Sequence, residues 1–226
     1  MCDKMLKLYS TTSFNRHRRN YENRTAVALS GTGCSVIATQ KFRTVPNPPA
    51  SIYELYGGFA GVVTGAFEDC MHVMNSSTTA VTQFLNRRVS VDEVLWPREV
   101  DSQQLHTLTL QARSLDCNML FISYDEEYGP HVYRTELEPQ YYDYFNCAAG
   151  SKMTDAHNYF RKHYKYNMPD EEALQMAVNC LASATQVDFK ASDIEVGIVS
   201  ESLPRLHKLS EGEIKHFVDN MEIDEC

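Results

Sequence analysis

The order in which strand-like and helix-like segments follow one another is the feature that most constrains the fold of this 226-residue chain. Apolar runs typical of strands lie at residues 25–29, 34–39, 59–64, 119–124, 131–135, 144–149 and 193–199. Apolar residues with helical spacing lie at 67–85, 90–112, 154–164, 169–186 and after 210. Because strands and helices come in groups without strict alternation, we expect an α+β protein with antiparallel sheets and helices layered outside them.

Local signals predict where some of these elements begin and end. Residues 30–33, Ser-Gly-Thr-Gly, separate the first two apolar runs and are typical of a hairpin turn. Pro97 lies inside the stretch 90–112 and predicts a helix start or a kink, because proline removes an amide donor. Ser210 and Glu213 have the spacing of a capping box, which predicts the start of a last amphipathic helix.

Composition excludes several classes of partner. The net charge of −9 argues against a phosphate backbone as ligand, and the short basic run at 16–19, with Arg24 nearby, is interpreted as a solvated face. No apolar run approaches the about 20 residues of a membrane-spanning helix, and no signal-peptide pattern comes first. Seven cysteines without a CxxC pair favour a reducing compartment, in which they would be small core residues. We therefore expect a soluble intracellular protein of one domain with no nucleic-acid or membrane partner.

Several segments together carry a resemblance to a known family. Residues 188–199, Asp-Phe-Lys-Ala-Ser-Asp-Ile-Glu-Val-Gly-Ile-Val, are the most specific of them. The others are residues 34–41, residues 63–65 with Asp69, residues 125–133 and residues 148–150. In this order and spacing they resemble the proteasome alpha-subunit family over about residues 24–217, and most closely the iota-type subunit at ring position one. Residues 1–23 diverge from the family pattern, so residues 24–226 are expected to form a single alpha-type domain.

The resemblance implies a fold and a set of partners. The fold would be a four-layer αββα sandwich of the N-terminal-nucleophile hydrolase class. The chain would sit in a seven-membered alpha ring of the 20S core, above a beta ring, and would help to form the substrate pore. It would receive regulatory caps through their ATPase tails in ubiquitin-dependent degradation, in the cytoplasm and the nucleus.

The resemblance also frames the question of catalysis. Catalytic relatives use an amino-terminal threonine whose free amine is the base, so cleavage must expose it. Thr11 and Thr12 lie near the start, but Ser10 stands where a glycine would precede the cut, and Gln40 stands where the catalytic aspartate would fall. We expect no catalytic residue. The alternative is an active beta-type threonine peptidase.

Other candidate sites have simpler interpretations. His157 and His163 are six residues apart and lack the spacing of metal ligands, so no metal and no cofactor is expected. The aromatic residues of the segment 141–145 are interpreted as packing or interface residues.

The family places a lysine at the pocket that receives a cap's tail. Counting back from residues 63–65 without gaps puts Glu54 at this position, and Gly65 and Asp69 complete the candidate cap-docking pocket. Two alignments of the first residues stay open. One puts Leu8 and Tyr9 on the family's first helix, and the other puts residues 14–17 on its gating tail.

Overall fold

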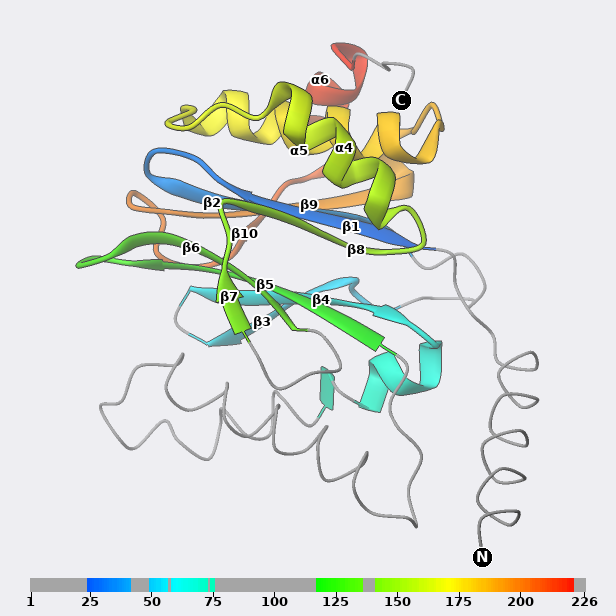
Figure 1. Ribbon diagram of the computed structural model, residues 1–226, viewed down its shortest axis with the longest axis horizontal. Coiled ribbons are helices and arrows are strands. Elements are labelled where there is room, and N and C mark those ends of the chain that lie inside the picture. Colours follow the sequence, from blue (N-terminus) through cyan, green and yellow to red (C-terminus); the bar gives the residue numbers. More distant parts are fainter. Residues whose placement is uncertain are drawn as a thin grey trace, which may run out of the picture.

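Two five-stranded antiparallel sheets lie face to face in the computed structural model, which describes residues 24–41, 49–56, 58–72, 74–75, 117–135 and 141–221 (Figure 1). The first sheet has the order β10 (His207–Lys208), β9 (Ile194–Ser200), β2 (Cys34–Gln40), β1 (Thr25–Ser30), β8 (Asn146–Gly150). The second has the order β3 (Ile52–Tyr56), β4 (Phe59–Gly65), β5 (Cys117–Asp125), β6 (Gly129–Thr135), β7 (Tyr141–Asp143).

Helices cover the outer face of the first sheet. Figure 1 shows α4 (Met153–His163) and α5 (Asp170–Thr185) across this face, with α6 (Glu211–Asp219) beyond them. A short 3-10 turn, η1 (Ala191–Asp193), leads into β9. Residues 67–72, beyond β4, are helical on the side of the second sheet, as predicted. The expected α+β sandwich is confirmed, while the helical stretch predicted at 90–112, with Pro97, lies outside the described residues.

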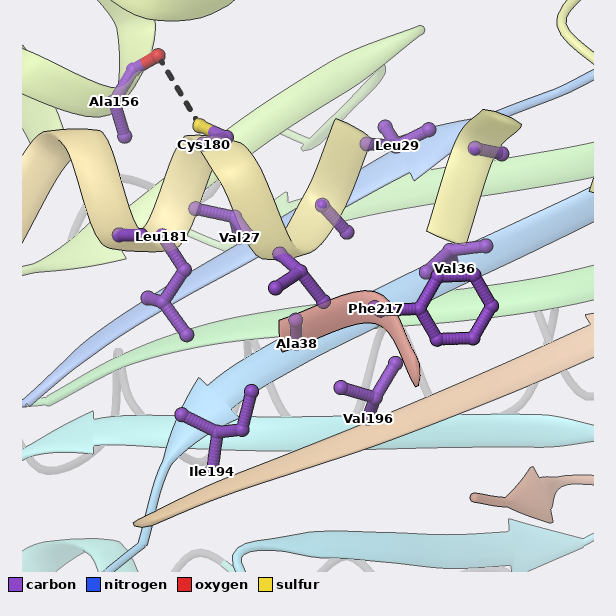
Figure 2. Close-up of a cluster of buried hydrophobic side chains, with 14 of the residues drawn as sticks. Val27, Leu29, Val36, Ala38, Ala156, Cys180, Leu181, Ile194, Val196 and Phe217 are labelled. Carbon is purple, nitrogen blue, oxygen red and sulfur yellow. Dashed lines mark hydrogen bonds between the residues drawn. The ribbon is translucent and has the colours of Figure 1, made fainter. Parts of the chain in front are cut away.

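The alternation of side chains along β1 explains why its run is apolar throughout. Val27 and Leu29 face the helix layer, whereas Ala26 and Ala28 face the second sheet. A strand that is buried on both faces needs apolar residues at successive positions. Val27 therefore has neighbours from α5, and Figure 2 shows it beside Leu181.

The described cysteines are core residues. Cys34, Cys70, Cys117, Cys147 and Cys180 are all buried free thiols, as the sequence predicted. The Cys180 thiol donates to the carbonyl oxygen of Ala156 at 3.6 Å and so links α5 to α4 (Figure 2). Burial, followed by the carboxylate of Asp170, raises the pKa of Cys34 to about 12.

The capping box predicted at the last helix is present. The Glu213 amide donates to the Ser210 hydroxyl oxygen at 3.4 Å, and the Ser210 amide donates to the Glu213 carboxylate at 2.7 Å. Hydrogen bonds from the Ser210 hydroxyl and amide lower the pKa of Glu213. The sequence therefore located the start of α6 correctly.

Three short strands were not predicted. β3, β7 and β10 all lie at sheet edges, where one side of the strand has no ladder partner within its sheet. β3 also contains a register shift between Glu54 and Tyr56. Edge strands carry weaker hydrophobic patterns than central ones, because only part of their surface is buried.

Candidate functional site

The start of β1 holds a buried arginine that joins the two sheets. Arg24 is only 4% exposed. Its Nη2 donates to the carbonyl oxygen of Val63 in β4 at 2.6 Å, and its Nη1 donates to that of Gln40 in β2 at 3.4 Å. The interpretation of Arg24 as part of a solvated basic face was wrong, because its guanidinium finds backbone acceptors inside the fold.

Thr25 follows as the first residue of β1 and is fully buried. Its backbone amide donates to Oε1 of Gln40 at 2.9 Å. Its hydroxyl oxygen lies 3.3 Å from that of Ser151 and accepts from the amide of Lys152 at 3.2 Å. The Thr39 hydroxyl donates to the Thr25 carbonyl oxygen at 3.3 Å. Each polar group of Thr25 is thus used within the protein.

Gly150 closes this end of the site from β8. It pairs with Thr25 across the β1–β8 ladder and has φ +100°, which L side chains rarely adopt. A Cβ atom here would lie 2.0 Å from the carbonyl oxygen of Arg24, and the next amide, of Ser151, donates to that oxygen at 3.1 Å. Only glycine lets the two backbones approach this closely.

This arrangement is suited to holding the fold together. An N-terminal nucleophile needs a free amine and an accessible hydroxyl. Here the nitrogen of Thr25 is an internal amide that donates a hydrogen bond to Gln40, because Arg24 precedes Thr25 in the chain. Gln40 contributes a neutral carboxamide oxygen as acceptor. The Thr25 nitrogen is therefore an amide, unlike the free amine that such a nucleophile uses as its base.

Sequence reasoning found only part of this site. It singled out Gln40 and missed the roles of Arg24, Thr25 and Ser151. The available signal was Gly150, which ends the small-residue run 148–150, because a glycine there indicates a close backbone approach. Ser10, Thr11 and Thr12 lie outside the described residues.

The three residues of the candidate cap-docking pocket do not meet at one point. Glu54 is exposed in β3 and pairs with Ala60, whereas Gly65 pairs with Cys117 at the far end of β4. Five residues along a strand correspond to about 17 Å. Asp69 is buried, at 2% exposed. Of the three, Glu54 alone offers an exposed charged side chain.

The two histidines considered as metal ligands contact different groups. His157 Nε2 lies 3.3 Å from Nη1 of Arg134, and because a guanidinium only donates, that histidine nitrogen acts as acceptor. His163 stacks on Tyr159 with ring centroids 4.4 Å apart. Within the described ranges no cluster of three metal-ligating side chains occurs. In the same part of the chain, no helix is long and apolar enough to cross a membrane.

The aromatic segment 141–145 is described only in part, since the side chains of residues 141–143 lie outside the description. Phe145 is exposed and meets Tyr166 edge-on, with ring centroids 5.2 Å apart.

Comparison with known proteins adds the family context. A family model described as "Proteasome subunit" matches residues 21–199. The chain is 28% identical over 210 residues to "Proteasome subunit alpha type-6" of Caenorhabditis elegans, which covers 89% of this chain and 85% of that protein. It is 25% identical over 191 residues to "Probable proteasome subunit alpha type-1" of Schizosaccharomyces pombe, covering 80% and 78%. "Proteasome subunit alpha" of Pyrococcus horikoshii is 30% identical over 121 residues, which are 54% of this chain and 45% of that protein.

Proposed function

This chain belongs to the proteasome subunit family, and we propose that within it the chain is a non-catalytic alpha-type ring subunit. One observation carries this proposal: the start of β1 is closed. Arg24 fills it, and Gln40 accepts a hydrogen bond from an internal amide at the position expected for a catalytic aspartate. Relatives named as alpha subunits support the same assignment.

The function follows from assembly. The chain packs between neighbouring alpha subunits in a seven-membered ring, rests on a beta ring, and contributes to the substrate pore and to the docking of regulatory caps. Contacts between unlike faces close into a ring only when each subunit meets the next at a fixed rotation. The two packed sheets, tied together at Arg24, supply the rigid body that such a fixed rotation requires.

A finer assignment is the iota-type subunit at ring position one. The stretch 188–199, which includes η1 and most of β9, supports it because its sequence resembles that subunit's pattern. Cross-linking mass spectrometry of the assembled particle identifies both ring neighbours. Neighbours that differ from those of position one would refute the assignment.

Two further properties accompany this proposal. Residues 24–226 act as a single alpha-type domain after a divergent segment 1–23. The particle works in the cytoplasm and the nucleus, which is supported by the free buried thiols of the described residues. Imaging of a tagged chain would show whether it occupies both compartments.

The absence of catalysis gives a direct prediction. Changing both Thr11→Ala and Thr12→Ala in the assembled particle is expected to leave every peptidase rate unchanged, since neither hydroxyl acts as a nucleophile. The measurement is hydrolysis of fluorogenic peptides of each cleavage class. Selective loss of one activity would instead establish the alternative, an active beta-type threonine peptidase.

A second prediction concerns cap docking at Glu54, which we propose as the residue at the position of the family's pocket lysine. A carboxylate facing a cap's terminal carboxylate at 4 Å changes an attraction of about 1 kcal/mol in water into a similar repulsion. The total, about 2 kcal/mol, corresponds to about thirtyfold weaker binding. Glu54→Lys is therefore expected to strengthen binding of an activator-tail peptide, measured by fluorescence polarisation.

Glu172 supplies the control for this experiment, because it is also exposed and lies in α5, on the outer face of the first sheet. Glu172→Lys makes the same change in net charge away from the candidate pocket. If both variants bind the tail peptide equally, or if Glu54→Lys binds no better than the unchanged particle, Glu54 does not line the pocket.

A further inference from the structure

The end of the sandwich opposite to Arg24 is formed by turns that are bonded to one another. The Thr32 amide donates to the carbonyl oxygen of Met168 at 2.8 Å, which joins the β1–β2 turn to the α4–α5 loop. The Glu201 amide donates to the carbonyl oxygen of Gly33 at 2.9 Å. We call this surface the turn end; it comprises residues 31–33, 125–129, 144–145, 164–170 and 201–206, and Figure 1 shows its β1–β2 and β5–β6 turns at the left.

Large apolar side chains are exposed at this end. They are Tyr128 (73% exposed), Phe145 (59%), Tyr166 (68%) and Leu203 (49%). Phe145 and Tyr166 meet edge-on at an interplanar angle of 90°. The Phe145 carbonyl oxygen accepts from the Ser30 amide at 2.8 Å, so its backbone is fixed to the β1–β2 hairpin. Aromatic side chains held in place before binding are typical anchors of an interface.

Carboxylates outnumber cations at the turn end. Among the described residues of the turn end, the carboxylates are Asp125, Glu126, Glu127, Asp170 and Glu201, against the cations Lys165 and Arg205. Desolvation, followed by the negative charges of Glu201 and Glu126, raises the pKa of Tyr124. A surface that combines exposed apolar side chains with an excess of carboxylates is complementary to a partner that carries apolar and positive side chains together.

We propose that the turn end docks a basic segment of a separate protein that visits the particle, with large apolar side chains of that segment contacting Phe145 and Tyr166. The proposal goes beyond ring membership, because a visiting partner needs a face that ring assembly leaves open. Exposed apolar patches with polar rims mark such interaction surfaces. The carboxylates of the turn end guide the encounter, and the aromatic pair holds the segment.

Photo-cross-linking on the assembled particle tests this proposal. The probe is a fluorescent synthetic peptide of alternating lysine and leucine with one p-benzoylphenylalanine, and its counterpart carries glutamate in place of lysine. The basic probe is expected to cross-link to the tryptic peptides that contain Phe145 and Tyr166, and the acidic probe is not. The yield at these peptides is followed against probe concentration by mass spectrometry.

Two variants and a matched control separate the contributions. The double change Phe145→Ser and Tyr166→Ser is expected to weaken labelling about tenfold or more. The double change Glu126→Gln and Glu127→Gln weakens it several-fold at low ionic strength, and the difference disappears at about 1 M salt, where the screening length is about 3 Å. The control, Asp188→Asn with Glu211→Gln, removes the same charge at two exposed positions outside the turn end and leaves labelling unchanged.

Two outcomes would overturn the proposal. One is equal labelling of the serine variant. The other is no labelling of the turn end in a particle that native mass spectrometry shows to contain the chain, because a ring neighbour or residues 1–23 then cover the surface. Native mass spectrometry tests ring membership independently of the cross-linking. Failure of the docking proposal therefore does not contradict the ring assignment.

Discussion

Gly150→Ala is expected to raise the equilibrium constant for local opening of the β1–β8 ladder several hundredfold. The new methyl group would lie 2.0 Å from the Arg24 carbonyl oxygen, which is backbone and cannot move aside as a side chain would. The φ of +100° adds strain for any residue with a Cβ atom. Together these costs come to about 3–4 kcal/mol. Hydrogen exchange of the assembled particle, measured on peptides covering β1 and β8, reports the change as faster exchange.

Gly129→Ala supplies the matched control. Gly129 also has a positive φ, +85°, but its Cβ atom would meet nothing within 4 Å. Its substitution is therefore expected to cost only about 1 kcal/mol, from backbone conformation alone. The difference between the two variants isolates the close approach of Gly150 to Arg24. Similar exchange in both variants would show that β8 moves away at little cost, and would refute the tight closure of the site.

Arg24→Met is expected to loosen the connection between the two sheets. Methionine fills much of the same volume but leaves the carbonyl oxygens of Val63 and Gln40 without the guanidinium donors. Hydrogen bonds from charged donors contribute about 1.5–3 kcal/mol each, and one of these two is long, so the expected cost is about 3 kcal/mol. Exchange in β4 and at the end of β2 should rise about a hundredfold.

Two other substitutions make the Arg24 result specific. Arg24→Lys keeps the charge and one donor within reach, so it is expected to recover part of the protection. Arg205→Met removes a charge from an exposed position and should leave exchange in β4 unchanged. If Arg24→Met and Arg205→Met behave alike, the guanidinium does not tie the sheets together.

The central strands and the long helices were predictable because their patterns are local. β1 and β2 are buried on both faces and read as continuous apolar runs, and α5 shows helical spacing. β3 forms a hairpin with β4, but further hydrogen bonds that fix its position come from residues far along the chain. The Glu195 carboxylate accepts from the amides of Ser51 and Ile52, and Lys208 donates to the Ile52 carbonyl oxygen. A local sequence pattern does not predict hydrogen bonds between residues about 150 positions apart.

The candidate site shows the same limit. Gln40 was found because a resemblance marks its position. Arg24 follows a polar segment and reads as one more surface cation, since its role depends on a carbonyl oxygen in β4. The candidate docking residues depend on strand pairing in the same way. Alignment to the family assigned Glu54 and Gly65 to one pocket. In the structure Glu54 pairs with Ala60, at the opposite end of β4 from Gly65.

A native mass spectrum of the purified particle, followed by ejection of single subunits, tests the central claim most directly. This chain is expected to be released from a multi-subunit ring assembly with the residues before Arg24 still attached, because no cleavage exposes a threonine. A chain that begins at Thr11, Thr12 or Thr25, or one that occurs only as a free monomer, would contradict a non-catalytic ring subunit.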